Sequence, residues 1–299
     1  MRSIYWLQLV LLSILWGGSF FCVAVAVAEL PPLTVVLARV GLAAIVMVAL
    51  VHVAGERLPT RLSDWKLLAG MGLLNNAIPF TVISWGQVHI DSGLASILNA
   101  TTPFFTVLLA HVLTRDERMT PAKLLGVLIG LAGVVALIGP ATLSGLGIDG
   151  LAQGAVLVGA LSYAFAGIHG KRLKHLSSPV AAAGMLIAST VMLFPVTLMV
   201  DPPVTALPSM KTLAAIFFMA VFSTGLAYIL YFRILRVAGA TNVLLVTFLV
   251  PVSALTLGIV ILDEALTWHA MLGMALIFAG LAAVDGRIFK FVHIGTPRG

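Results

Sequence analysis

Two stretches of this sequence, "DERMTPAKLLGVLIGLAG" (residues 116–133) and "DEALTWHAMLGMALIFAG" (residues 263–280), carry the same pattern of residues. Each begins with Asp-Glu, and has Thr three residues after the Glu and Gly nine and sixteen residues after it. The glycines are Gly126 and Gly133 in the first stretch, and Gly273 and Gly280 in the second. The copies lie 147 residues apart, which predicts an internal repeat.

Landmarks outside these stretches recur at nearly the same offset. The corresponding pairs are Trp16 with Tyr163, Pro32 with Pro179, and Pro103 with Pro251. Chance similarity between glycine-containing apolar helices is the alternative, but it does not explain why several landmarks keep one order and spacing. We therefore expect two related units, residues 1–139 and residues 150–286, followed by a tail at 287–299.

The composition indicates whether the protein is soluble or embedded in a membrane. The chain is 61% hydrophobic and only 9% charged, with a mean hydropathy of +1.13, whereas a soluble domain has roughly 25% charged residues. We expect an all-α protein embedded in a lipid bilayer, with no nucleic-acid partner for its net charge of +6. Cys22 is the one cysteine, so there is no disulfide framework or thiolate metal cluster, and no cofactor or metal is expected.

Ten apolar runs have about the length that a membrane helix needs. They are too long and uniform for barrel strands, and a helix pairs its backbone groups within the segment. The first run imitates a cleavable signal peptide, but it exceeds the usual apolar core of such peptides and is interpreted as a helix. The expected spans are 4–28, 33–54, 66–88, 92–113, 121–139, 150–169, 179–200, 211–232, 239–262 and 268–286.

Lys and Arg predict the orientation of these spans. If the N-terminus is cytoplasmic, every Lys and Arg except Arg39 and Lys211 lies in or beside a cytoplasmic segment. Such asymmetry is typical of membrane proteins and predicts that both termini are cytoplasmic. Because each unit holds five spans, an odd number, the second unit must be inverted relative to the first. Inverted repeats are the usual architecture of secondary transporters.

The repeated stretch itself is expected to pack helices rather than to bind a ligand. Gly126 and Gly130 form the G-x-x-x-G pattern that lets membrane helices approach closely. The Asp-Glu pairs suit the positive end of the helix dipole that follows them.

These landmarks resemble the drug/metabolite transporter superfamily, in its ten-helix form built from two EamA-type domains. The resemblance lies in "LWGGSF" (15–20), Arg39, "NATTPFFTVLLAHVLTRDERMT" (99–120) and "FLVPVSALTLGIVILDEALT" (248–267), and covers residues 7 to 286. It implies a transporter in the bacterial cytoplasmic (inner) membrane, with a cavity enclosed mainly by spans 1, 3, 4, 6, 8 and 9. In appearance the chain is closest to bacterial aromatic amino acid exporters.

Prolines within the spans indicate where a substrate binds. A proline leaves the carbonyl four residues earlier without its hydrogen-bond donor, and irregular backbone is tolerated at membrane depth where it lines a cavity. The prolines are Pro79, Pro103 and Pro251, and the carbonyls that they free belong to Asn75, Asn99 and Thr247. The alternative is that the polar side chains only repair these helix breaks.

Polar and aromatic side chains inside the spans complete the candidate site. Aromatic residues of membrane helices also serve as packing or interface anchors, but Trp16 and Tyr163 lie mid-span and are related by the repeat. The expected substrate-binding residues are Trp16, Asn75, Asn76, Phe80, Asn99, Thr102, Tyr163, Tyr228 and Thr247, with Pro79, Pro103 and Pro251 as helix breaks for gating.

Charges at depth bear on the energy source. No Asp or Glu lies mid-span, whereas proton- or sodium-coupled carriers normally keep one there despite a cost of about 2.5–3.5 kcal/mol. We expect facilitation or exchange without obligatory proton coupling. Arg39 is the one deep charge, and either Glu29, helix-terminal carbonyls or a substrate carboxylate can pair with it.

The sequence therefore predicts an exporter of small metabolites, foremost aromatic or other neutral amino acids, that works by alternating access. Lipophilic drugs, nucleosides or other metabolites, with or without proton coupling, are the alternative cargo. An intramembrane enzyme lacks a gathered nucleophile and base, and a scaffold or lipid sensor would not require an inverted repeat. A monomer already contains both halves.

Overall fold

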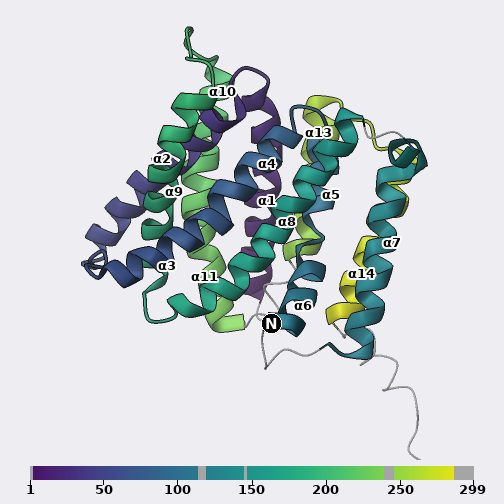
Figure 1. The fold of residues 1–299 in the computed structure, drawn as a ribbon, viewed down its shortest axis with the longest axis horizontal. Helices are drawn as coiled ribbons and strands as arrows, with labels where there is room; N and C mark the ends of the chain where they lie inside the picture. Colours follow the sequence, from purple (N-terminus) through teal and green to yellow (C-terminus); the bar gives the residue numbers. More distant parts are fainter. Residues whose placement is uncertain (1–2, 114–118, 145–146, 239–245, 286–299) are drawn as a thin grey trace, which may run out of the picture.

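The computed structural model describes residues 3–113, 119–144, 147–238 and 246–285. Over these residues the protein is helical throughout, with no β-strand (Figure 1). The first half contains α1 (Ser3–Val27), α2 (Pro32–Val53), α3 (Leu62–Gly72), α4 (Ile78–Gly86), α5 (Ser92–Asn99), α6 (Thr102–Leu113) and α7 (Pro121–Ser144). The second half contains α8 (Ile148–Gly170), α9 (Ser178–Val200), α10 (Met210–Phe218), α11 (Ala227–Ala238), α13 (Val246–Leu262) and α14 (Trp268–Asp285).

Several of these helices join end to end into single spans. Two π-helical segments, η1 (Leu73–Ala77) and η3 (Met219–Leu226), connect α3 to α4 and α10 to α11, and a break at Ala100 and Thr101 separates α5 from α6. Seven of the resulting helices are long and apolar enough to cross a membrane, and α7, α13 and α14 supply shorter apolar helices within the described residues. The expectation of a multi-span, all-α membrane protein is confirmed. The start of the predicted span 239–262 and the tail 287–299 lie outside the described residues.

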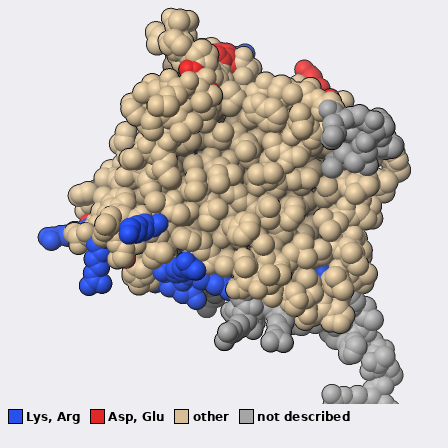
Figure 2. All heavy atoms as spheres, viewed as in Figure 1, with Lys and Arg blue, Asp and Glu red and all other residues tan. Residues whose placement is uncertain are grey.

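The surface and the interior have the polarity expected of a protein in lipid. Large apolar side chains such as Ile45, Val191 and Phe194 are exposed on the helices, whereas serines, threonines and amides are buried between them. Figure 2 shows a broad belt without charges, bordered by basic side chains at the lower end and acidic side chains at the upper end. The middle of this surface therefore suits the hydrocarbon region of a bilayer.

We refer to these two ends by their loop residues. The basic end carries Arg57, Arg61, Lys66, Lys171 and Lys174, and the acidic end carries Glu29, Asp91, Asp201 and Glu264 together with Lys211. Successive spans run between the two ends, so the loops that the structure describes lie at one end or the other (Figure 1).

The repeated glycines hold α7 and α14 together at backbone contact. A Cβ atom built on Gly126 would lie 2.6 Å from the carbonyl oxygen of Gly280, and one on Gly133 would lie 2.9 Å from that of Gly273. The contact is reciprocal, because the first glycine of each repeated stretch meets the second glycine of the other. In Figure 1 this pair of helices forms one side of the molecule. The packing interpretation of the opening stretches agrees with these contacts.

The remaining helices pack against one another around the centre of the molecule. Helix α1 lies against α13, and α8 lies against α4, α5 and α6, while α2 packs against α9. Gly17 of α1 allows the close approach of α13, since a Cβ there would lie 2.6 Å from the Cβ of Ser253. These pairs surround the cavity described next.

Candidate functional site

A cavity of about 680 Å³ lies between the helices. Eight of the expected residues line it, and they come from α1, η1, α4, α5, α6, α8, α11 and α13: Trp16, Asn75, Phe80, Asn99, Thr102, Tyr163, Tyr228 and Pro251. Spans 1, 3, 4, 6, 8 and 9 all contribute, as the resemblance implied, and α2 and α9 add Arg39 and Met185. A volume of this size is typical of sites for small molecules.

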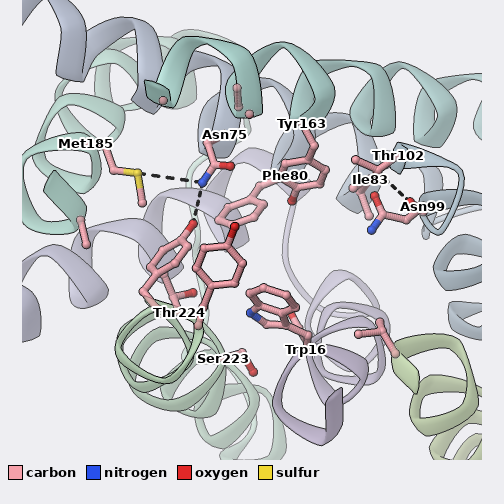
Figure 3. A pocket seen from close by; sticks show the side chains of 18 of the residues that line it. Trp16, Asn75, Phe80, Ile83, Asn99, Thr102, Tyr163, Met185, Ser223 and Thr224 are labelled. Carbon is pink, nitrogen blue, oxygen red and sulfur yellow. Dashed lines mark hydrogen bonds between the residues drawn. The ribbon is translucent and has the colours of Figure 1, made fainter. Parts of the chain in front are cut away.

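Aromatic rings form much of the cavity wall. Figure 3 shows Trp16 facing Phe80 and Tyr163 across the open space, with each ring on a different helix. The ring of Trp16 also contacts that of Tyr231, with centroids 5.8 Å apart. Such a wall binds apolar or aromatic groups through burial of surface and ring contacts.

A hydrogen-bonded network fixes one side of this wall. The amide of Asn75 donates to the phenol oxygen of Tyr228 over 2.7 Å, and that phenol donates to Oδ1 of Asn76 over 3.2 Å. Asn76 in turn donates to Ser189 of α9 over 3.1 Å. Asn76 is 0% exposed and does not line the cavity. Its position allows it to orient Tyr228, and through Tyr228 the wall itself.

Two acceptors on the opposite side have no partner. The Oδ1 atom of Asn99 and the Oε1 atom of Gln87 are buried without a hydrogen bond, and both residues line the cavity. Gln87 donates through its Nε2 atom to the carbonyl of Phe20 over 2.9 Å, so its orientation is fixed. In Figure 3, Asn99 and Asn75 lie on opposite sides of the aromatic residues. Neither oxygen exposes surface to the cavity, so a ligand N–H donor would satisfy these costly unpaired acceptors only after a local rearrangement of the wall.

Two of the three predicted helix breaks, at Pro79 and Pro103, are present and are partly repaired by other side chains, whereas α13 runs without interruption through Pro251. Pro79 follows the π-helical segment η1, whose displaced carbonyl at Leu74 accepts a hydrogen bond of 2.7 Å from Ser162. Pro103 follows the break between α5 and α6, where the hydroxyl of Thr102 donates to the carbonyl of Asn99 over 2.8 Å. The carbonyl of Asn99 is therefore not free for a ligand.

The other expected residues lie as follows. Pro79 and Pro103 are buried and do not line the cavity, while Pro251 does so from the interior of α13. The side chain of Thr247 lies outside the described residues. Three lining residues were not predicted from the sequence: Ser84, Gln87 and Met185. Ser84 in α4 and Gln87 just after its end share a helical spacing with Phe80 and Ile83, and this spacing could have revealed them.

Arg39 is the one charged residue that the structure describes in the depth of the cavity. Its guanidinium carbon lies 3.9 Å from the centroid of the Phe80 ring, and its Nε atom donates to the hydroxyl of Thr224 over 3.0 Å. The pairing with Glu29 that the sequence allowed is not formed, because Glu29 accepts both hydrogen bonds of Ser209.

The cavity reaches one end of the molecule and is closed at the other. At the basic end, Lys171 and Lys174 line it, whereas none of the acidic residues of the opposite end does. Three carboxylates tie helices together at the acidic end: Glu29 binds Ser209 before α10, Asp201 binds Thr34 of α2, and Glu264 binds Ser92 and Gly93 of α5. The cavity therefore extends toward the basic end.

Comparison with known sequences identifies the family. The sequence pattern of the EamA-like transporter family matches residues 3–139 and 151–284, most of the chain. The chain belongs to the EamA-like transporter family. It is accordingly a small-molecule transporter, and the family and its relatives are transporters rather than enzymes.

Relatives with similarity along the whole chain agree. The "Uncharacterized inner membrane transporter YedA" of Escherichia coli is 27% identical, over 96% of this chain and 91% of its own length. YoaV of Bacillus subtilis, named an uncharacterized transporter, is 26% identical over 92% of this chain and 94% of its own. A "Probable amino-acid metabolite efflux pump" of Escherichia coli is 28% identical over 91% of both chains.

A crystal structure shares the fold. It matches with a TM-score of 0.68 and 20% identity, covering 99% of this chain and all of the other. With the apolar spans and the inner-membrane relatives, these findings make the chain a multi-pass protein of the inner membrane.

Proposed function

We propose that this EamA-family protein exports amino acids, foremost aromatic and other neutral ones, by alternating access through the central cavity. The observation that carries the proposal is the cavity itself, with aromatic rings on its walls and the unpaired amide acceptors of Asn99 and Gln87 beside them. Rings suit an apolar side chain, and the two acceptors suit an ammonium group once the wall opens to it. The relative named a probable amino-acid metabolite efflux pump supports the same substrate class.

The proposed machinery consists of two inverted five-helix halves, residues 1–139 and 150–286. The reciprocal contacts of Gly126 with Gly280 and of Gly133 with Gly273 support a two-fold relation between α7 and α14. The two separate ranges that match the family, and the π-helical segments in the third and eighth spans, support it further. Halves related in this way can exchange inward- and outward-facing shapes.

The proposed orientation puts the basic end and both termini in the cytoplasm. The enrichment of Lys and Arg at that end supports it. The cavity extends to Lys171 and Lys174, and the carboxylates of the opposite end hold that end closed. The structure would then be the inward-facing state, ready to receive substrate from the cytoplasm.

The proposed energy source is the substrate gradient or exchange. No Asp or Glu is among the described residues that line the cavity. Without a carboxyl group in contact with the cavity, the residues described offer no side chain of the usual kind for carrying a proton with the substrate.

The test uses the purified protein in proteoliposomes loaded with labelled neutral amino acids, nucleosides or cationic drugs. We expect efflux of neutral amino acids that persists when an ionophore collapses the pH gradient. If only nucleosides or drugs were transported, the proposed substrate class would be wrong. If net efflux stopped when the pH gradient was collapsed, the proposed energy source would be wrong. In cells, overproduction should confer resistance to toxic amino acid analogues.

A further inference from the structure

Arg39 lies about two turns into α2, nearer its start than its end, as a buried, fixed cation. Its side chain is 7% exposed and lines the cavity. The ring of Phe80 covers one face of the guanidinium group, and the hydroxyl of Thr224 accepts its Nε hydrogen bond. These two contacts fix the guanidinium plane but use only one of its five N–H donors.

The remaining four donors have no acceptor among the residues that the structure describes. No carboxylate there pairs with Arg39: Glu29 is bound to Ser209, and no Asp or Glu among the described residues lines the cavity. A guanidinium group stays protonated even when it is buried. A buried charge without a counter-ion is costly, and at membrane depth such a residue marks a functional site.

We propose that Arg39 binds the carboxylate of the transported substrate through its two terminal amino groups. The inference rests on the proposed function and adds the group that anchors the substrate. The planar fork of an arginine matches a carboxylate in a bidentate pair. The contacts with Phe80 and Thr224 prepare the fork before the substrate arrives, which lowers the cost of binding.

The charge balance favours a monoanion over a phosphate ester. Arg39 contributes one positive charge at depth, and the lysines that line the cavity, Lys171 and Lys174, lie at the basic end. A carboxylate neutralises this single charge, whereas a phosphate dianion would bring a second negative charge into an apolar cavity. An uncharged or purely cationic substrate would leave Arg39 unpaired.

The experiment compares acids with their amides in the same proteoliposomes. L-phenylalanine, L-leucine and L-threonine are each paired with the corresponding amino acid amide, which keeps the ammonium group and the side chain. We expect the wild-type protein to take each transported acid with a half-saturating concentration at least about tenfold below that of its amide. 3-Phenylpropionate should compete with phenylalanine, and phenyl phosphate should compete less well.

Substitutions then assign the preference to the residue. Arg39→Gln should raise the half-saturating concentration of the acid at least about tenfold and bring the acid-to-amide ratio close to one. Arg39→Lys should be intermediate, because it keeps the charge but loses the fork. The matched control is Arg57→Gln at an exposed residue of the basic end, which should leave the ratio unchanged.

The outcomes separate the two proposals. If the wild-type protein transports acids and amides equally well, or Arg39→Gln keeps the acid preference, the carboxylate inference is overturned while amino acid export stands. If phenyl phosphate competes better than the carboxylates, Arg39 recognises a phosphate instead. If no amino acid is transported at all, the proposed function fails and takes this inference with it. Should Arg39→Gln not fold, the acid-to-amide ratio of Arg39→Lys decides: a ratio as large as in the wild type overturns the inference, and a reduced ratio supports it.

Discussion

Asn75 and Asn76 are adjacent in η1, and their side chains point in different directions. Asn75 lines the cavity and donates to Tyr228, whereas Asn76 is buried against α9 and bonded to Ser189. The two side chains therefore leave η1 in different directions, one toward the cavity and one toward α9. We therefore assign Asn75 to the wall of the cavity and Asn76 to the support behind it.

Trp16 offers the clearest test of the wall. Trp16→Ala should lower amino acid flux about tenfold, because it removes the ring that faces Phe80 and Tyr163. Expression in the membrane should remain intact, since Trp16 borders the cavity and is only partly buried against the neighbouring core. The measurement is initial flux in proteoliposomes, normalised to protein.

The matched control is Trp268→Ala at the start of α14. Trp268 is 67% exposed and does not line the cavity. Its variant should keep wild-type flux. Equal flux in wild type and Trp16→Ala would remove Trp16 from the site.

The sequence predicted much of this site because polar residues are rare in apolar spans. Trp16, Asn75, Asn99 and Tyr163 stood out in that way, and all four line the cavity. Arg39 was singled out, but its partners were not, because a side chain's neighbours on other helices cannot be read from its own helix.

At the scale of helices, the α7–α14 pair depends on glycine at two crossings. Gly126→Ala should destabilise the protein by about 1–3 kcal/mol, because the new methyl group would lie 2.6 Å from the carbonyl oxygen of Gly280. The measurement is thermal unfolding in detergent. A variant as stable as the wild type would contradict the close packing.

Gly154→Ala in α8 is the matched control. No atom lies within 4 Å of a Cβ built there, and alanine favours a helix over glycine by about 1 kcal/mol. Gly154→Ala should therefore leave the protein as stable as the wild type or make it more stable.

The contact between Glu29 and α10 predicts a dependence on pH. Hydrogen bonds from the side chain and backbone of Ser209 hold the pKa of the Glu29 carboxyl below its ordinary 4.5. A depressed folded-state pKa adds stability above the unfolded-state value, and this stability is lost as the pH falls through the folded-state pKa. Glu29→Gln should thus be less stable than the wild type at pH 7, and the difference should begin to shrink near pH 4.5 and vanish once the pH lies below the folded-state pKa.

Thermal unfolding across this pH range checks the prediction. A constant difference between Glu29→Gln and the wild type from pH 7 to acid would show that the carboxylate charge does not contribute.

Helix breaks mark the limit of what the sequence reveals about these elements. The prolines predicted the interruptions at Pro79 and Pro103, and both occur where expected. Their form was not predictable: one became a π-helical segment and the other a break between two helices, because Ser162 and Thr102 accommodate the displaced carbonyls differently.

At the scale of the molecule, the account depends on the relation between the two halves. Composition was sufficient to predict a multi-span helical membrane protein, since few charges leave no soluble alternative. The cavity arises only when helices from both halves, among them α1, α8 and α13, surround it, which local sequence patterns do not describe. In the proposed inversion the two halves cross the membrane in opposite directions, and the residues that correspond in the repeat meet at the centre of the molecule.

Cysteine labelling tests the inversion most directly. Cys22 is the one cysteine, so Cys22→Ala provides a background for Asp116→Cys and Asp263→Cys. A membrane-impermeant maleimide applied outside spheroplasts should label position 263 and not position 116, and inverted vesicles should give the opposite result. Labelling of both positions from the same side would contradict the inverted halves, and with them the proposed alternating-access transporter.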